Sequence, residues 1–186
     1  MKPTKRLCDP EYVIYHGQKI PIKTDFRNGL RALHVANDAT ISSFEKVYGL
    51  IYILFGVIPD SEEMAEFLWK KGKAYLQCGD SDEEQNARTK DMDFDYDMGF
   101  IEASFQSDYG IDLQTANMSW WRFIRLISGF TEQSVMSRVR QIRTTDLNEY
   151  KDPKTREKIA KAKRDLAFDT EYSDEEKALI EQFNAL

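Results

Sequence analysis

The stretch Met118–Phe130, MSWWRFIRLISGF, constrains the fold more than any other part of this sequence. Its apolar side chains recur at the spacing of one face of an α-helix. They are Trp120, Phe123, Ile124 and Ile127. Ser119 is placed to cap the first turn, and Gly129 to end the helix in a left-handed conformation. The pattern therefore predicts a short helix that anchors the main core through Trp120.

The second tryptophan of this stretch, Trp121, cannot share a helix face with its neighbour. It must pack on a second surface, which is either another part of the core or a partner protein. Arg125 follows one turn later and is placed to cover the Trp121 ring through a cation–π contact. We therefore take Trp121 and Arg125 as candidate partner-binding residues. No residue type used in catalysis is arranged here.

The composition is that of a folded protein with one core. The chain has 186 residues, of which 41% are hydrophobic and 12% aromatic. Its formal net charge is −6, which excludes a simple basic nucleic-acid-binding protein but not a local basic patch. The only cysteines, Cys8 and Cys78, imply no disulfide framework, so we expect a reducing cytoplasm. The N-terminus has no apolar run after its lysines, and the longest apolar stretch, Gly49–Ile58, is too short for a bilayer. We therefore expect neither a signal peptide nor a membrane span.

The apolar spacing predicts a mainly α-helical bundle that begins with a short N-terminal β-hairpin. Tyr12–Tyr15 and Ile20–Ile22 both alternate and flank His16-Gly17, so we expect two strands joined by a tight turn. Helices are expected from Thr24 or Asp25, over Ser42–Phe55, from Asp60, over Asp95–Tyr109, over the tryptophan stretch, after Thr131 and from Asp152-Pro153. The expected core positions are Phe26, Leu30 and Leu33 in the first helix, Phe44, Val47, Ile51 and Leu54 in the second, and Val135, Val139 and Ile142 in the sixth.

We expect residues 1–168 to form a single mainly helical domain, with an acidic connection at about 80–95. Residues 169–186 are expected to form a C-terminal tail with a last short helix from Ser173. So short a helix cannot bury all of its apolar side chains alone, and they are further candidates for contact with a partner. They are Leu179, Ile180 and Phe183.

No metal, cofactor or catalytic site is predicted. Five carboxylates match the ligand positions of a calcium-binding EF-hand loop, namely Asp91, Asp93, Asp95, Asp97 and Glu102. Tyr96, however, stands where the sharp turn of that loop needs glycine, so we expect a solvated acidic segment that caps the following helix. His16 and His34 have no partners at metal-binding spacing. Nucleotide-binding and nucleophile motifs are also missing, and we expect no enzymatic activity.

Charge is distributed unevenly along the chain. Asp80–Asp112 contains eleven acidic and two basic residues, whereas Ser119–Phe168 contains twelve basic and six acidic ones. Such polarity favours pairing within the chain or head-to-tail self-association, and the simpler alternative is a solvated face of each sign. Nucleic-acid binding is the weaker alternative, and its candidates are Arg138, Arg140, Arg143 and Lys151–Arg164. Arg138 is also a candidate partner-binding residue.

Several segments resemble one family of phage proteins. IPIKTDFRNGL follows the expected hairpin, LFGVIP ends the apolar second helix, and YLQCG ends the third. DFDYDMGFIEASFQSDYGIDL then precedes MSWWRFIRLISGF. Over about Tyr12–Phe168 the chain is similar to a small tail-module protein of long-tailed phages and prophages of Gram-positive bacteria, encoded just before the tape-measure protein. Gly29 departs from this family, which often carries a large aromatic residue there, and we expect it to weaken the first helix by about 1 kcal/mol.

The resemblance implies a function similar to that of tail assembly chaperones. Such proteins coat the tape-measure protein, recruit tail-tube subunits and leave before the virion is complete. It further implies action in the cytoplasm of the bacterial host, by binding the tape-measure protein and/or the tail-tube protein. A homo-oligomer would cover a long filament better than one copy. A structural component of the virion tail and a nucleic-acid-binding regulator are the alternatives.

Overall fold

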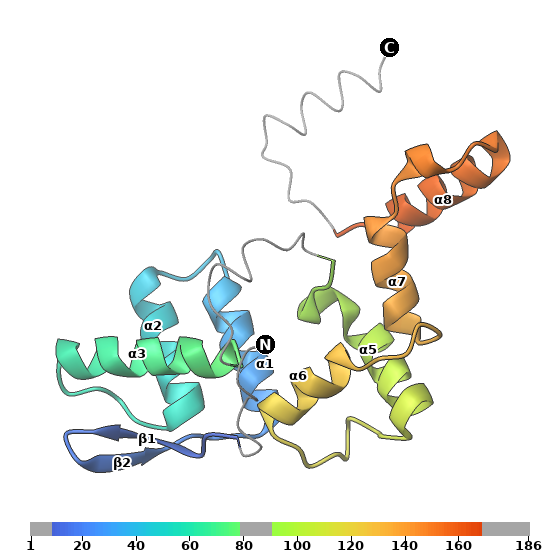
Figure 1. The fold of residues 1–186 in the computed structure, drawn as a ribbon. Helices are drawn as coiled ribbons and strands as arrows, with labels where there is room; N and C mark the ends of the chain where they lie inside the picture. Colours follow the sequence, from blue (N-terminus) through green and yellow to red (C-terminus); the bar gives the residue numbers. More distant parts are fainter. Residues whose placement is uncertain (1–8, 79–90, 169–186) are drawn as a thin grey trace, which may run out of the picture. The chain divides into compact units, whose positions relative to one another are not determined.

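The computed structural model describes residues 9–78 and 91–168 of the chain. These residues contain seven α-helices and a two-stranded antiparallel hairpin, which confirms the predicted mainly α-helical fold (Figure 1). The chain forms two compact units, Met1–Met136 and Ser137–Leu186. The acidic residues 79–90 and the expected tail helix, with Leu179, Ile180 and Phe183, lie outside the described residues. No described helix combines the length and apolar character needed to cross a membrane.

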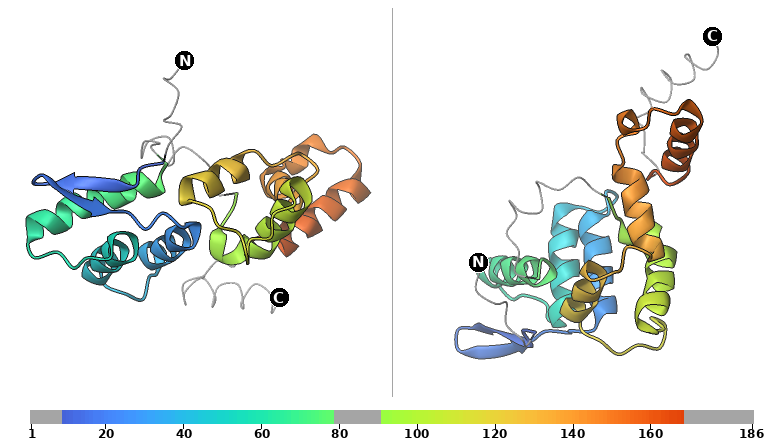
Figure 2. Two further views of the ribbon diagram at one scale, coloured as in Figure 1. Left: turned by 90° about the horizontal axis from the view of Figure 1, so that it is seen from below. Right: turned by 45° about the vertical axis from the view of Figure 1, so that its right-hand side comes forward.

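Five of the helices lie wholly in the first unit. They are α1 (Phe26–Asn37), α2 (Ser43–Phe55), α3 (Glu62–Leu76), α5 (Phe94–Tyr109) and α6 (Trp120–Ser128). α2 packs against both α1 and α3, and α6 packs against both α1 and α5. Figure 2 shows the same helices and the hairpin in two further views.

The hairpin pairs β1 (Tyr12–Tyr15) with β2 (Gln18–Pro21). His16 and Gly17 have φ values of 44° and 81°, and positive φ at both positions is what a two-residue type I′ turn requires. The predicted hairpin and its turn are thus confirmed, although β2 begins earlier than expected. A two-stranded sheet is marginal alone, and β1 packs along α3.

Short polar side chains cap the first three helices. Asp25 caps α1, and Ser42 forms a reciprocal capping box with Glu45 at the start of α2, in agreement with the expected helix starts. In α3 the cap is Ser61 rather than Asp60, because the Ser61 hydroxyl accepts a hydrogen bond from the first turn. The error is one residue, and it arises because both side chains are good N-caps.

The first turn of α2 is exposed, which contradicts the predicted core position of Phe44. This side chain is 65% exposed, whereas Leu50, Ile51 and Leu54 are buried. All buried residues of α2 lie in its second half, where α1 and α3 cover it. Helical spacing defines a face, but it does not define how much of that face the neighbouring elements cover.

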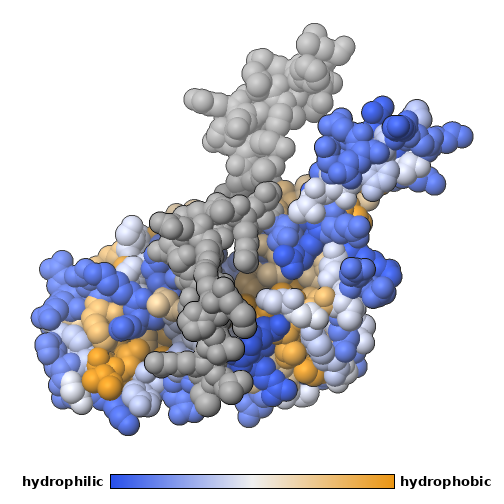
Figure 3. Space-filling model, in the orientation of Figure 1, coloured by the Kyte–Doolittle hydropathy of each residue, from blue (hydrophilic) through white to orange (hydrophobic). Residues whose placement is uncertain are grey.

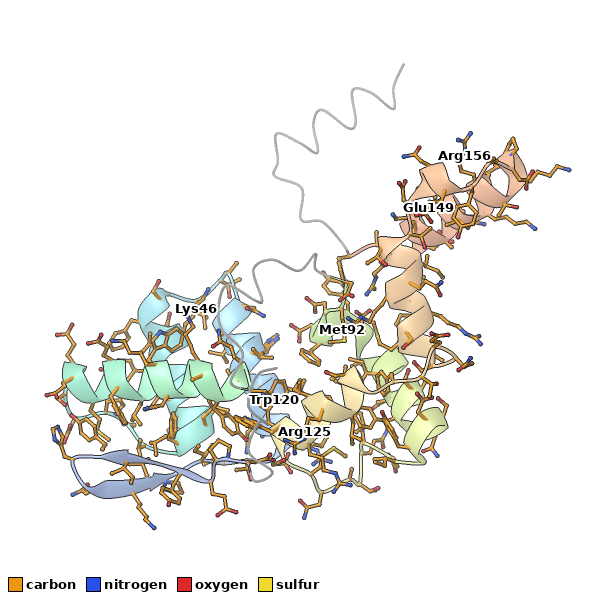
Figure 4. All side chains as sticks on the ribbon, viewed as in Figure 1. Lys46, Met92, Trp120, Arg125, Glu149 and Arg156 are labelled. Atoms are coloured by element: carbon orange, nitrogen blue, oxygen red, sulfur yellow. The ribbon has the colours of Figure 1, made fainter. Side chains whose placement is uncertain are left out.

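Trp120 anchors the core of the first unit, as predicted (Figure 4). Its side chain is 1% exposed and lies directly over Gly29 of α1. The buried residues of α1 are therefore Phe26 and two small ones, Gly29 and Ala32, whereas the expected Leu30 and Leu33 are only half-buried. Phe123 stacks on Phe26 and Phe105, with ring centroids 4.8 and 5.2 Å apart.

Backbone hydrogen bonds hold the start of α6 beside the start of α1. The Phe26 N–H donates to the Met118 carbonyl (3.1 Å), and the Trp120 N–H donates to the Thr24 carbonyl (2.8 Å). Ser119 caps α6 as predicted. Gly129 also ends the helix, but its φ is −99°, so the predicted left-handed conformation is wrong.

The acidic residues before and within α5 act as caps and partners of that helix. Asp93 is the N-cap, and its own backbone N–H donates to the buried Asp97 carboxylate (2.8 Å). Asp95 pairs with His34 of α1, with Nδ1 and Oδ2 3.1 Å apart. Since α5 begins at Phe94, most of the sequence that matches a calcium loop is helical.

The helix α7 (Val135–Thr144) begins later than the cap predicted at Thr131. The Thr131 N–H instead donates to the Asp108 carboxylate at the end of α5 (2.7 Å). Met136 is buried and Val135 is 39% exposed, so the predicted core face is wrong at its first position. Val139, the next predicted core position, is buried as expected.

The second unit contains most of α7, the 3-10 helix η1 (Leu147–Glu149) and α8 (Pro153–Asp165). Asp152 caps α8, as predicted. No residue of α8 is buried. The Arg143 guanidinium of α7 lies 4.0 Å from the centre of the Phe168 ring, just beyond α8, which ties the end of the described chain to α7.

Candidate binding groove between the hairpin and α3

An open groove with a volume of about 910 Å³ runs along the hairpin in the first unit. We call it the hairpin groove. Its lining comes from four places in the chain: Asp9, Pro10 and Glu11 before the hairpin, Tyr12, Val13, Ile14 and Ile22 in and after it, Phe67, Lys71, Ala74 and Tyr75 on α3, and Trp121 on α6. In Figure 3, hydrophobic surface is visible where α3 passes the hairpin.

The outer edge of β1 forms one wall of the hairpin groove. The strand register and the hydrogen bond from the Ile22 N–H to the Glu11 carbonyl (2.8 Å) show that odd-numbered residues of β1 bond to β2. The backbone N–H and C=O groups of Tyr12 and Ile14 therefore point away from β2. Their side chains are 44% and 56% exposed. Such an edge offers both backbone hydrogen bonds and apolar contact to another chain.

One face of α3 forms the opposite wall. Phe67, Lys71 and Tyr75 follow one another at four-residue spacing, so they lie in one row on the helix. The Phe67 ring lies 5.1 Å from that of Tyr15, and the Lys71 ammonium lies 5.5 Å from the Phe67 ring centre. The wall is thus apolar at its base, with one ammonium group along its rim.

Tyr75 closes the inner end of the hairpin groove. Its side chain is 3% exposed, and its hydroxyl donates to the Thr24 carbonyl (3.4 Å). Burial raises the pKa of this phenol, and the nearby Asp9 carboxylate raises it further. Tyr75 is therefore neutral at all physiological pH values and contributes a packing surface rather than a charge.

Trp121 joins the hairpin groove to α6. Its indole N–H donates to the Tyr75 carbonyl (2.8 Å), and the two rings lie 6.2 Å apart. The neighbouring Trp120 donates to the Leu76 carbonyl (2.9 Å). The paired tryptophans thus bind the last two carbonyls of α3, one from the core and one from the groove. Trp121 is partly buried, so its second surface is both a core contact and a groove wall.

Arg125 does not cover Trp121, contrary to prediction. Its Nη1 atom lies 3.0 Å from Oδ1 of Asp9, and the Ser119 hydroxyl donates to the other carboxylate oxygen of Asp9. This pairing fixes the chain at the entrance of the hairpin groove. It also neutralises the Asp9 carboxylate, which is the most enclosed carboxylate of the groove. The cation–π expectation considered only helical neighbours, whereas the preferred partner comes from the distant N-terminal segment.

The comparisons with known proteins concern the same residues. A model of the family described as bacteriophage Gp15 protein matches residues 9–168. This match spans most of the chain and includes every residue that lines the hairpin groove. The chain belongs to the bacteriophage Gp15 protein family. It is therefore a phage protein, and its family suggests a structural or assembly role. No curated protein and no solved structure matches it.

The other predicted partner-binding residue of this Gp15-family chain within the described part is Arg138. It is exposed on α7 in the second unit. Among the described residues, no group of three or more His, Cys, Asp or Glu side chains is placed to hold a metal ion. The hairpin groove presents apolar side chains and backbone groups, which suit it to binding a polypeptide.

Some of the groove residues of this Gp15-family chain had recognisable signals in the sequence. Tyr12 and Ile14 were expected on one face of the hairpin, and Phe67 is apolar on an amphipathic helix. Their meeting with Trp121 depends on contacts between segments far apart in the chain, and local periodicity does not encode such contacts.

Proposed function

We propose that this Gp15-family protein is a non-enzymatic phage tail assembly protein. In this proposal it acts as a chaperone that binds the tape-measure protein and/or the tail-tube protein through the hairpin groove. The binding takes place in the cytoplasm of the bacterial host. Membership of a phage family supports the phage context, and the sequence resemblance to tail-module proteins supports the narrower role.

The observation that carries the proposal is an apolar groove beside the outer edge of β1, which pairs with no other strand among the described residues, with charge at the rim of the groove. Tape-measure proteins are long helices, and before tail assembly their apolar stripes need cover. The hairpin groove offers Ile14, Phe67 and Trp121 for apolar contact, with Glu11 and Lys71 at its margins. An extended segment of a tail-tube subunit has a second mode available, because the edge of β1 accepts a further strand.

Two other functions remain as alternatives. A structural component of the virion tail would use the same groove permanently. A nucleic-acid-binding regulator is favoured by one observation, the basic character of the second unit, where residues 137–168 include Arg138, Arg140, Lys154, Arg156, Lys158 and Lys161. Mass spectrometry of purified virions separates the chaperone from the virion component. A salt-dependent gel shift with DNA tests the regulator.

The deciding experiment is co-purification of the tagged full-length chain with co-expressed tape-measure protein, and in a second arm with tail-tube protein. Ile14→Asp places a charge in the hairpin groove at a side chain that is already 56% exposed, so the fold is expected to survive. Val135→Asp is the matched control, because Val135 is an exposed aliphatic residue outside the groove.

We expect capture of at least one partner by the unaltered chain and by Val135→Asp, and loss of capture by Ile14→Asp. Circular dichroism confirms that both variants fold. Capture of neither tail protein by the unaltered chain would contradict the proposal. Equal capture by both variants would show that binding does not use the hairpin groove.

A further inference from the structure

A stripe of aromatic side chains is exposed along α2. Phe44, Tyr48 and Tyr52 follow one another at i, i+4 and i+8, so they lie on one side of the helix. Phe44 is 65% exposed and Tyr52 is 57% exposed. Tyr48 is half-buried, and its ring stacks on that of Phe44 at a centroid separation of 4.3 Å. We call these three residues the aromatic stripe. Ile58, just beyond the end of α2, is 76% exposed.

The aromatic stripe has no role in the core or in the hairpin groove. The stripe flanks the packing face of α2: Leu50 and Leu54, which pack on α1 and α3, are fully buried, whereas Phe44 and Tyr52 are exposed. None of the three aromatic residues lines the groove. Aromatic side chains carry large apolar areas, and an exposed row of them marks an interaction surface.

The two ends of the aromatic stripe carry opposite charges. Glu45 lies exposed in the first turn of α2, where its Oε2 atom accepts hydrogen bonds from Ser42. Lys23 lies at the last turn, since its backbone N–H donates to the Leu54 carbonyl (2.7 Å). Its ammonium group lies 5.3 Å from the centre of the Tyr52 ring. Within the described residues, neither Glu45 nor Lys23 forms an ion pair.

This arrangement is complementary to itself. When two copies of α2 cross antiparallel about a two-fold axis at Tyr48, Phe44 of each copy lies opposite Tyr52 of the other. The same operation brings Glu45 of each copy to the end where the other copy carries Lys23. An unrelated partner helix would need an apolar row with a positive charge opposite Glu45 and a negative charge opposite Lys23. A second copy of this chain provides that arrangement by symmetry.

We propose that the aromatic stripe is the interface of a homodimer, formed by antiparallel packing of α2 against α2 of a second copy. The two ion pairs fix the register, and the aromatic rings supply most of the apolar contact. The hairpin groove is built from other elements, so each copy in the dimer carries its own groove. The inference does not depend on which protein that groove binds.

Sedimentation equilibrium of the full-length chain tests the dimer. Phe44→Asp places a carboxylate in the first turn of a helix, which helices tolerate well, and we expect it to weaken the dimer at least about tenfold. Tyr96→Asp is the matched control, because Tyr96 is a 53% exposed aromatic residue in the first turn of α5, outside the aromatic stripe. We expect this control to dimerise like the unaltered chain.

Charge reversal tests the register. Lys23→Glu and Glu45→Lys each place like charges opposite one another across the two-fold axis, so each is expected to weaken the dimer. The double variant restores both pairs in reverse order and is expected to recover the dimer. Circular dichroism is recorded for all variants, because Glu45→Lys also removes half of the capping box. Tyr52→Ala provides a further variant, because it removes an exposed ring at the other end of the aromatic stripe and leaves the capping box intact.

A monomer at high micromolar concentration would overturn the proposal. So would an oligomer that Phe44→Asp and Tyr52→Ala leave unchanged, because self-association would then use another surface. Weakening by single charge reversals without recovery in the double variant would overturn the antiparallel register. If the unaltered chain is a monomer and Phe44→Asp abolishes its capture of a tail protein, the aromatic stripe binds that protein and not a second copy.

Discussion

Gly29 of α1 and Trp120 of α6 are in a contact that leaves no room for a side chain at position 29. A Cβ atom on Gly29 would lie 2.3 Å from Cε3 and 2.4 Å from Cδ2 of the Trp120 ring. The sequence suggested only that glycine weakens α1 through its conformational freedom. The structure adds the compensating effect, since the missing side chain admits the largest buried residue of the core.

Gly29→Ala is expected to destabilise the protein although alanine favours helix formation. The gain in helix propensity is about 1 kcal/mol, but the new methyl group must displace the buried indole ring, and overpacking of this kind costs about 1–3 kcal/mol. Larger side chains at this position should cost more. Urea denaturation, followed by tryptophan fluorescence, measures the change in the free energy of unfolding.

Gly99→Ala provides the control for this prediction. Gly99 is also a glycine within a helix, but a Cβ atom there meets nothing within 4 Å. Its replacement should stabilise the protein by up to about 1 kcal/mol. A stabilising effect of alanine at both glycines would show that Trp120 yields easily and that the contact is not a constraint.

The two adjacent tryptophans should differ in their contribution to stability. Trp120→Ala removes a side chain that is 1% exposed and is expected to cost about 3–5 kcal/mol. Trp121→Ala should cost less, because its ring is partly solvent-exposed in the hairpin groove. Trp121→Phe keeps a ring but loses the hydrogen bond to the Tyr75 carbonyl, worth about 1 kcal/mol. Chemical denaturation of the three variants gives the ranking, and a larger loss for Trp121→Ala than for Trp120→Ala would reverse it.

The elements of the fold were predictable because their signals are local. The Ser119 cap, the Asp152-Pro153 start and the His16-Gly17 turn each lie within a few residues of the structure that they specify. Core faces were less predictable. Phe44 satisfies the helical period of α2 but lies beyond the reach of α1 and α3. In α7, Met136 is buried and the expected Val135 is exposed, although Val139 is buried as expected.

The hairpin groove was predictable only in fragments. Trp121 was identified as needing a second surface, but its partner is a carbonyl on α3, well separated in sequence. Arg125 was assigned to the nearest aromatic ring, while its actual partner, Asp9, comes from the N-terminal segment. Pairings of this kind follow from how helices pack, and one sequence read locally does not specify that packing.

We also predict that the acidic segment at the start of α5 forms no calcium site. Tyr96 stands where an EF-hand loop needs glycine, and Asp95 and Asp97 are already engaged within the helix and with α1. Because α5 begins at Phe94, the carboxylates cannot wrap around one ion as a loop does. Isothermal titration of the full chain with Ca²⁺ is the measurement, and micromolar binding would contradict the prediction.

Asp108 should contribute to stability at neutral pH and lose this contribution in acid. The backbone N–H of Thr131 donates to its carboxylate (2.7 Å), and this hydrogen bond, with that of the Ser107 side chain, lowers the pKa of Asp108. A carboxylate whose pKa is lower in the folded state stabilises the protein above its ordinary pKa. The stabilisation falls as the pH drops through the folded-state value, below about pH 4.

Asp108→Asn should therefore lower the melting temperature at neutral pH and reduce the further loss below about pH 4. The reason is that the side chain at position 108 is then a neutral acceptor for the Thr131 N–H at every pH. The connection from the end of α5 to the segment before α7 therefore no longer depends on a charge. Glu149→Gln is the control, since Glu149 is exposed and its side chain has no hydrogen bond to a described residue (Figure 4). Thermal melts of both variants between neutral and acidic pH test this, and a profile for Asp108→Asn parallel to that of the unaltered chain would show that the Thr131 contact does not respond to the charge of Asp108.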